Sequence, residues 1–329
     1  MNFKERFWTR ALRMILAGCL VAGLIFSGGC PDGGKCAAMQ KDKEVCAGVC
    51  QKAKDETVRE RFWIWGHDVG MYTNDRSNPT VVSFKIPGTS RITPVEGAYY
   101  MGVPNMIFVK YMGKPAMPYE QYAIPFRALK KVYWSIVDGG RAVGQGEKEA
   151  VLKLAAGMPN ITGVFMDDFF MDEEALQKGQ DEAGMLSVAQ LRKIREELNN
   201  VNGRRLDLAV TLYTHQLEPG IMSHIDLCDV VTIWTWKSED LKDLESNFAK
   251  LKQMMPTKRI MLGCYMWDFG NNKPMPVERM ERQCEIGLKW LKEDQIEGMI
   301  FLATPICDLN LEAVEWTRGW ISKVGDDRL

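Results

Sequence analysis

Two adjacent carboxylates, Asp167 and Asp168, are the residues whose types and spacing point most directly to chemistry. They end the apolar run Gly163 to Met166, and two phenylalanines follow them. Carboxyl groups crowded in an apolar setting repel each other and are poorly solvated, which keeps one of them protonated near neutral pH. A protonated carboxyl can act as a general acid. In the structural alternative, one Asp caps the following loop and the other pairs with a basic neighbour such as Lys110.

Aromatic residues recur at the ends of later apolar runs. Tyr213 and His215 share one face of an extended segment because side chains alternate with a period of two, and Trp234 and Trp236 do the same on the next. Flat rings of this kind stack well on the apolar C–H faces of sugar rings. The residues predicted to bind a carbohydrate are Lys110, Tyr213, His215, Trp234, Trp236 and Trp267.

Other common catalytic groups lack the spacing they need. His67 and His215 can both approach one end of an α/β fold, but the sequence has no H-x-H or H-E-x-x-H motif. No serine stands in a G-x-S-x-G turn. We therefore expect no metal ion and no cofactor. A metal-dependent hydrolase, with His67, His215 and the aspartates as ligands, stays open as the weakest of three functions.

The elements that position these residues follow from alternation along the chain. Short apolar runs rich in β-branched and aromatic residues alternate with longer amphipathic segments, which is typical of parallel βα units. Eight such runs close a barrel, so we expect one (β/α)8 (TIM) barrel domain, with its site at the carboxyl ends of the strands. An open doubly wound sheet is disfavoured because the first run leads into Gly66-His67-Asp68-Val69-Gly70 without G-x-G-x-x-G spacing. The predicted strands are Phe62–Gly66, Asn105–Lys110, Val132–Val137, Thr162–Met166, Leu206–Tyr213, Val230–Trp234, Ile260–Tyr265 and Gly298–Leu302.

The helices between the strands are indicated by their ends. Ser187 and Gln190 have the spacing of a capping box, and a helix should open near Thr93-Pro94. We also expect Ser238 to cap a helix that ends before Pro256.

The first residues indicate export. Four basic residues precede the uncharged run Met14 to Phe26, and small residues then lead to Cys30. The run is shorter than the 18 or more residues of a membrane-spanning helix. The segment resembles the signal of bacterial lipoproteins, which implies lipidation of Cys30 and a place in the cell envelope. We expect a signal peptide over 1–29, a tether over 30–60 and the barrel over 61–329, with the pairing of Cys36, Cys46 and Cys50 left open.

Charge and composition narrow the choice of partner. With 42 basic and 43 acidic residues the formal net charge is −1, so there is no electrostatic case for a nucleic acid. We expect a monomer that binds a carbohydrate and touches the membrane only through its lipid.

From residue 61 onward the sequence resembles the glycoside hydrolase barrels. Its closest local similarity is to the O-GlcNAcase-type barrels of family 84, which carry adjacent aspartates after strand four and a Trp-Thr pair after a later strand. Asp167-Asp168 and Trp234-Thr235 match those places. The resemblance implies that Asp167 orients the substrate acetamido group and that Asp168 is the general acid. The chain departs from the family where Phe169-Phe170 and Trp236 follow the two pairs.

Asp268 offers another arrangement of the catalytic carboxylates. It follows the seventh predicted strand and can work with Asp167 or Asp168 as nucleophile and acid/base. Such carboxyls lie about 5–5.5 Å apart in retaining enzymes and about 6.5–9.5 Å apart in inverting ones. We therefore predict an envelope glycoside hydrolase with Asp167, Asp168 and Asp268 as catalytic candidates. The runner-up is a non-catalytic carbohydrate-binding lipoprotein, in which the aspartates would be exposed and unperturbed.

Overall fold

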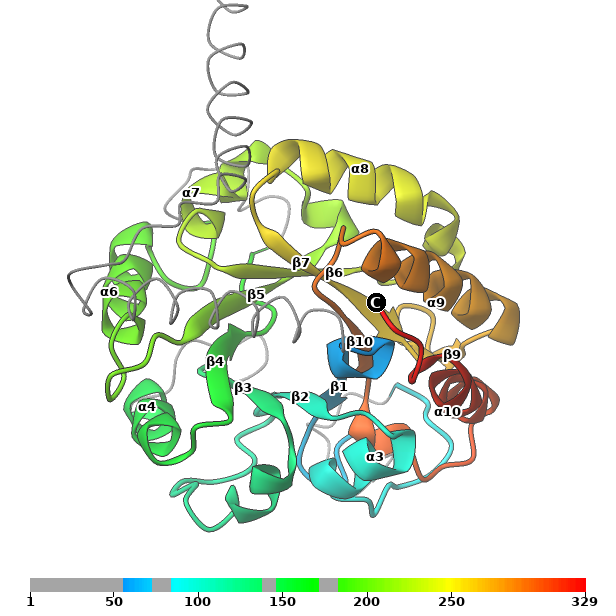
Figure 1. The fold of residues 1–329 in the computed structure, drawn as a ribbon, viewed down its shortest axis with the longest axis horizontal. Helices are drawn as coiled ribbons and strands as arrows, with labels where there is room; N and C mark the ends of the chain where they lie inside the picture. Colours follow the sequence, from blue (N-terminus) through cyan, green and yellow to red (C-terminus); the bar gives the residue numbers. More distant parts are fainter. Residues whose placement is uncertain (1–55, 73–83, 138–145, 172–182) are drawn as a thin grey trace, which may run out of the picture. The chain divides into compact units, whose positions relative to one another are not determined.

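Eight parallel strands close into a barrel, as predicted, in the order β1-β10-β7-β6-β5-β4-β3-β2 (Figure 1). The computed structural model describes residues 56–72, 84–137, 146–171 and 183–329, which belong to one compact unit, Lys54–Leu329. The predicted signal peptide, Cys30 and the cysteines of the tether lie outside the described residues. The strands of the barrel are β1 (Phe62–Gly66), β2 (Asn105–Phe108), β3 (Lys131–Ser135), β4 (Ile161–Met166), β5 (Asp207–Tyr213), β6 (Val230–Trp234), β7 (Arg259–Tyr265) and β10 (Gly298–Leu302).

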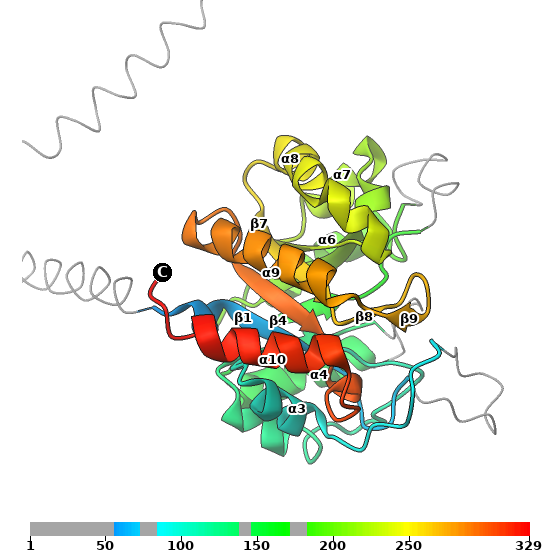
Figure 2. The same cartoon turned by 90° about the vertical axis from the view of Figure 1, so that its right-hand side faces the viewer.

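Helices surround the barrel and join consecutive strands (Figures 1 and 2). The α-helices are α3 (Pro94–Met101), α4 (Glu147–Gly157), α6 (Val188–Leu198), α7 (Met222–Ile225), α8 (Leu244–Met254), α9 (Val277–Lys292) and α10 (Glu312–Val324). The 3-10 helices are η1 (Val58–Arg61), η2 (Ile124–Ala128), η4 (Thr214–Gln216), η5 (Pro219–Ile221), η6 (Ser238–Asp243) and η7 (Thr304–Ile306). A short hairpin, β8 (Trp267–Asp268) with β9 (Lys273–Pro274), follows β7. Among the described residues, no helix is long and apolar enough to cross a membrane.

Two predicted helix starts are confirmed, and one is wrong. Thr93 and Ser187 each accept a hydrogen bond from the backbone of the third helical residue, and Glu96 and Gln190 complete the two capping boxes. Ser238 does not cap a helix, because it is itself the first residue of η6 and makes no capping bond. Its hydroxyl instead donates to a buried carboxylate, described below, so the polar side chain serves a tertiary contact.

Large aromatic side chains fill the barrel interior near the carboxyl ends of the strands. The Trp65 ring meets Phe165 and Trp234 edge to face, with centroids 5.3 Å and 5.2 Å apart. Trp234 fits because its neighbour on β7 is Gly263, where a Cβ would stand 2.1 Å from the indole. These rings come from β1, β4 and β6, so three strands are joined by direct contact beneath the carboxyl ends.

Candidate active site

A cavity of about 100 Å3 opens at the carboxyl ends of the barrel strands. This is below the roughly 300 Å3 of the smallest usual ligand pockets, so it can enclose little more than a single sugar ring. Nine of its fourteen lining residues are Trp, Tyr or Phe. The lining residues are Trp65, His67, Tyr72, Phe84, Tyr111, Asp167, Asp168, Thr211, Tyr213, Trp234, Trp236, Tyr265, Phe269 and Leu302.

Both strand-four aspartates reach this cavity, although they are adjacent in sequence. In a regular strand, neighbouring side chains point to opposite faces. Here β4 ends at Met166, and Asp168 adopts a left-handed backbone conformation with φ at 45°. Aspartate tolerates this conformation better than most residues. The turn redirects the second side chain, so both carboxyls line one cavity.

Two hydroxyls of the neighbouring strand β5 hold the two carboxylates. The Thr211 hydroxyl donates to Asp167 Oδ1 at 3.1 Å, and the Tyr213 phenol donates to Asp168 Oδ1 at 2.6 Å. Thr211 and Tyr213 are two residues apart and share a face of β5. Each aspartate thus has its own donor.

Desolvation raises the pKa of both carboxyls, and more strongly for the buried Asp167. Asp167 is only 7% exposed, and its pKa lies well above the usual range because of desolvation and the charge of Asp168. Desolvation also raises the pKa of Asp168, although the Tyr213 hydrogen bond lowers it in part. The Asp168 side chain is exposed to solvent at the cavity, so its pKa is raised less than that of Asp167. The pair therefore titrates as a unit that retains a proton to higher pH than ordinary aspartates.

His67 is held as a neutral imidazole. The Trp65 indole N–H, which can only donate, lies 2.9 Å from His67 Nε2, so Nε2 must be the acceptor. Nδ1 then carries the proton and donates to the Val109 carbonyl at 2.8 Å. Burial lowers the pKa of His67 to about 4. Because both ring nitrogens are occupied, His67 is not arranged as a metal ligand or a general base.

The predicted binding residues divide into two groups. Tyr213, Trp234 and Trp236 line the cavity. His215 is exposed, does not line the cavity and stacks on Tyr213, with centroids 5.5 Å apart and the planes at 10°. Lys110 does not reach the aspartates: its ammonium pairs with buried Glu147 at 2.5 Å.

Asp268 and Trp267 lie on the hairpin after β7 and do not line the cavity. Asp268 is fully buried, and it accepts hydrogen bonds from the Ser238 hydroxyl at 2.5 Å and from the backbone and side chain of Asn271. Trp267 donates its indole N–H to the Phe84 carbonyl at 3.1 Å. The structure therefore brings Asp167 and Asp168 together without Asp268.

Several lining residues were not among those chosen from the sequence. Trp65, Tyr265 and Leu302 come from strands, and the register of a barrel could have indicated them, since each stands at or next to a strand's carboxyl end. Tyr72, Phe84, Tyr111 and Phe269 come from loops, where no periodicity marks a side chain that turns inward.

No cluster of three or more His, Cys, Asp or Glu side chains within the described ranges is placed to hold a metal ion.

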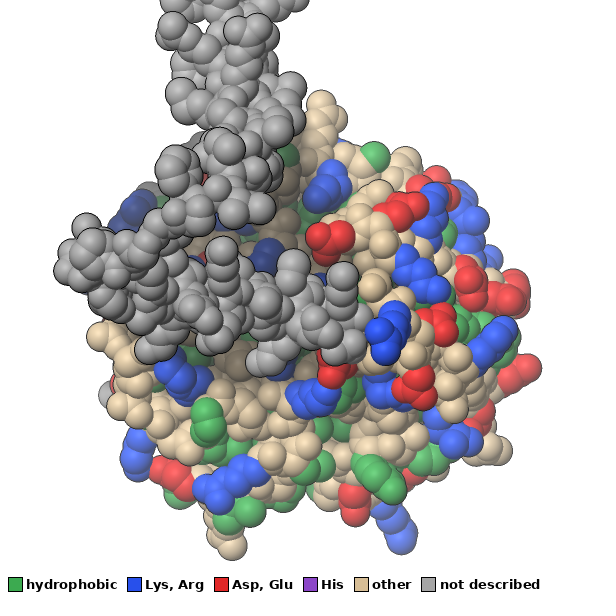
Figure 3. Space-filling model, viewed as in Figure 1, with side chains coloured by type: hydrophobic (Ala, Val, Ile, Leu, Met, Phe, Trp, Pro, Cys, Tyr) green, Lys and Arg blue, Asp and Glu red, His purple; other side chains and the backbone are tan. Residues whose placement is uncertain are grey.

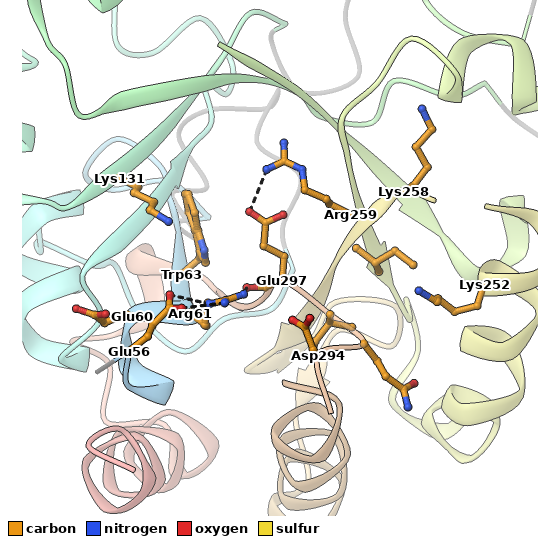
Figure 4. Close-up of a pocket in the computed structure, with 13 residues that line it drawn as sticks. Glu56, Glu60, Arg61, Trp63, Lys131, Lys252, Lys258, Arg259, Asp294 and Glu297 are labelled. Atoms are coloured by element: carbon orange, nitrogen blue, oxygen red, sulfur yellow. Dashed lines mark hydrogen bonds and ion pairs between the residues drawn. The ribbon is translucent and has the colours of Figure 1, made fainter. Parts of the chain in front are cut away.

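A second, charged cavity of about 440 Å3 lies at the amino ends of the strands (Figure 4). Two pairs of opposite charges contact each other there: Arg61 lies 2.7 Å from Glu56, and Arg259 lies 3.2 Å from Glu297. Acidic and basic side chains are likewise interspersed over α8, α9 and α10 (Figure 3). At this end of such barrels, charged residues usually serve stability and the chemistry lies at the other end.

The chain is similar to known proteins in its structure but not in its sequence. No family model matches it, and no curated protein matches its sequence. A putative alpha-L-fucosidase from Bacteroides thetaiotaomicron superposes with a TM-score of 0.51 at 9% identity, over 82% of this chain and 95% of that one. The GH99 endo-alpha-mannosidase of the same organism gives 0.47 at 10% identity, over 82% and 98%. The active domain 2 of a Pyrococcus furiosus chitinase, solved with chito-oligosaccharides, gives 0.43 at 14%, over 76% and 85%.

The chain is thus a (β/α)8 barrel with a distant structural similarity to glycoside hydrolases. At these identities the similarity establishes the fold, and the chemistry has to be argued from the site.

Proposed function

We propose that this chain hydrolyses a glycosidic bond. The observation that carries the proposal is the convergence of Asp167 and Asp168, both with raised pKa values, in an aromatic cavity at the carboxyl end of a barrel. Solved barrels of similar structure include enzymes named for acting on sugars, and one was solved with chito-oligosaccharides bound. Trp234, Trp236 and Tyr213 supply the flat surfaces on which a sugar ring can stack.

The chemistry follows from the proton that the pair retains. Asp168 reaches solvent through the cavity, so it delivers the proton to the leaving oxygen as the bond between that oxygen and the anomeric carbon breaks. In the reactive form the shared proton lies on Asp168, so that Asp167, deeper and held by Thr211, is ionised and stabilises the developing positive charge. Water then adds its oxygen to the anomeric carbon, and its proton returns to the pair. The role of Asp168 as general acid is the one that the resemblance to the family 84 barrels implies, whereas that resemblance implies that Asp167 orients a substrate acetamido group.

The non-catalytic carbohydrate-binding alternative expects solvated aspartates with ordinary pKa values. Burial of Asp167 and the mutual proximity of the two carboxyls argue against it.

We also propose that the protein is exported and anchored in the cell envelope through a lipid on Cys30, on the basis of the sequence alone.

The hydrolase proposal is tested by Asp168→Asn. We expect turnover of a natural-type glycoside to fall about 10²- to 10⁴-fold, because general acid catalysis is typically worth that much. Aryl glycosides with good leaving groups need less protonation and should lose much less rate. Asp167→Asn should also lower turnover of both substrate types, because it removes the stabilising charge.

The matched control is Asp294→Asn at the opposite end of the barrel, where the side chain is exposed and the residue has a φ of 53° that asparagine adopts readily. It should retain full activity. Full activity in both strand-four variants would disprove the assignment. Loss of activity in Asp268→Asn would then assign catalysis to the hairpin carboxylate.

A further inference from the structure

Five aromatic rings, which we call the ring wall, line the cavity in one unbroken series of contacts. Phe84 meets Phe269 with the ring centroids 5.0 Å apart, and Phe269 meets Tyr265 at 5.4 Å. Tyr265 then meets Trp236 at 5.8 Å, and Trp236 meets Tyr213 at 5.8 Å. All five residues line the cavity. Because each ring packs on the next, the wall presents a single surface on which a sugar can stack.

The hairpin of β8 and β9 holds this wall at three points. Phe269 belongs to the hairpin itself. Trp267 donates its indole N–H to the Phe84 carbonyl at 3.1 Å. The Gly270 N–H donates to the Trp236 carbonyl at 3.2 Å, and a Cβ at Gly270 would stand 2.6 Å from that oxygen. The placement of the hairpin therefore determines the placement of Phe84, Trp236 and Phe269.

Asp268 binds the hairpin to the barrel through a fully buried carboxylate. This group accepts from the Ser238 hydroxyl at 2.5 Å, from the Asn271 backbone N–H at 3.1 Å and from the Asn271 side-chain amide at 2.9 Å. Arg279 of α9 donates to the Ser238 oxygen at 2.7 Å, so the Ser238 proton has to point to Asp268. The described partners of the carboxylate are thus donors. An amide in its place would set its own NH2 group against one of them and lose that hydrogen bond.

We infer that Asp268 is a positioning residue for sugar binding: its carboxylate fixes the hairpin, and the hairpin fixes the ring wall. The inference rests on the proposed function, which assigns these rings to the sugar. Asp268 is not one of the described residues that line the cavity, so it acts on binding and not on the bond that breaks. In this role it is neither the nucleophile nor the acid/base that its place after the seventh strand suggests.

The kinetic test is Asp268→Asn in the full-length protein, with a 4-nitrophenyl glycoside that the wild type hydrolyses. We expect KM to rise about tenfold or more, because the displaced rings no longer fit the sugar. The kcat value should stay within about threefold, because Asp167, Asp168 and their donors on β5 are unchanged. Asp294→Asn, the matched control at the opposite end, should alter neither constant. A fall in kcat larger than the rise in KM would make Asp268 a catalytic residue and overturn the inference, as would two unchanged constants.

The half-buried Asn271 offers a milder variant if Asp268→Asn does not fold. Asn271→Ala removes one side-chain donor and leaves the Ser238 hydroxyl and the backbone N–H of residue 271 on the carboxylate. We expect KM to rise about two- to fivefold at constant kcat, in line with the loss of one hydrogen bond. Asn199→Ala, at the exposed end of α6, is the control and should leave KM unchanged. An unchanged KM in Asn271→Ala would contradict the positioning role.

Fluorine NMR of the protein labelled with 5-fluorotryptophan tests the positioning without a substrate. The resonances of Trp236 and Trp267, assigned with Trp236→Phe and Trp267→Phe, should shift or broaden in Asp268→Asn, while that of Trp316 on α10 should not. If the wild type hydrolyses no glycoside, the hydrolase proposal fails and these resonances still decide whether Asp268 holds the wall. If glycosides are hydrolysed but the two resonances do not change in Asp268→Asn, the hydrolase proposal stands and the positioning inference fails.

Discussion

Asp168 shows how one backbone angle turns sequence adjacency into a shared site. Its φ of 45° lies in the left-handed region, which costs a non-glycine residue about 1–2 kcal/mol. Such strain persists where the surroundings fix it, and here the Tyr213 phenol at 2.6 Å and the buried rings of Phe169 and Phe170 do so. Strain of this kind recurs at functional sites. The conformation is therefore consistent with a catalytic rather than a purely structural pair.

His67 links the site to the stability of the fold through its protonation. Its pKa is about 4 in the folded protein and about 6.5 in an unfolded chain. Between these values the unfolded state binds more protons, so stability must fall as pH falls from about 6.5 toward 4. Since the imidazole is fully desolvated, the loss reaches about 2 kcal/mol between pH 7 and pH 5.

We predict that His67→Gln removes this pH dependence, because glutamine can accept from Trp65 and donate to Val109 without titrating. The measurement is the free energy of unfolding by urea at pH 7 and pH 5. The wild type should lose about 2 kcal/mol more than His67→Gln over this interval. The aspartate pair is common to both proteins, so its opposite contribution cancels. His215→Gln, at the exposed histidine, should behave as the wild type; an unchanged slope in His67→Gln would refute the assignment.

The sequence predicted the cavity residues at strand ends better than those on loops and on the hairpin. Asp167, Tyr213 and Trp234 lie at the ends of apolar runs, where strand periodicity decides direction, and they line the cavity. Asp168 joins them through its left-handed turn. Asp268 also follows a strand, but the hairpin turns its carboxylate toward Ser238 and Asn271. Local periodicity cannot show such a turn.

The strands show why the fold itself was predictable. The bounds of β1, β6 and β10 match the predicted ranges, because each is a short apolar run of β-branched and aromatic residues ended by polar or small ones. The first residue of a helix is harder to predict than a strand, because it depends on the hydrogen bond of a single side chain. Ser187 is followed directly by the helix that it caps. Ser238 instead donates its hydroxyl to a buried carboxylate, and α8 begins only at Leu244.

The contact between β6 and β7 depends on a residue without a side chain. At Gly263 a Cβ would lie 2.1–2.4 Å from three atoms of the Trp234 indole, well inside any real contact. Trp234 is 1% exposed and touches Trp65, so its ring cannot move without displacing the cavity floor. The packing of two strands and the shape of the site are therefore coupled here.

We predict that Gly263→Ala destabilises the protein by about 1–3 kcal/mol, as overpacking of a filled core does. It should also weaken sugar binding, since Trp234 lines the cavity. The matched control is Gly319→Ala in α10, where nothing lies within 4 Å of the new methyl group. That change should stabilise by about 0.5–1 kcal/mol through helix propensity. Thermal and urea unfolding would decide, and a neutral Gly263→Ala would show that the indole is free to move.

The two ends of the barrel differ in the surroundings of their charged side chains. At the amino ends, Arg61 and Arg259 are paired with carboxylates around an open, charged cavity (Figure 4). At the carboxyl ends, Asp167 and Asp168 stand among aromatic rings without a described cation. Exposed or partly exposed ion pairs contribute up to about 1 kcal/mol each, so these pairs add only modestly to the stability of the barrel. Desolvation raises the pKa of both aspartates, so negative charge on this pair is costly in the protein.

The last prediction concerns where the whole molecule resides. A basic start, an uncharged run from Met14 to Phe26 and small residues before Cys30 are typical of a lipoprotein signal. We expect Cys30→Ala, expressed in a bacterial host, to abolish acylation and release the protein from the membrane fraction. Activity toward soluble aryl glycosides should be unchanged, because Cys30 precedes the barrel. Mass spectrometry of the wild-type amino terminus checks the modification, and Cys36→Ala is the matched control that should stay anchored. An unmodified wild-type terminus at any residue other than Cys30 would exclude the lipid anchor and leave the barrel chemistry untouched.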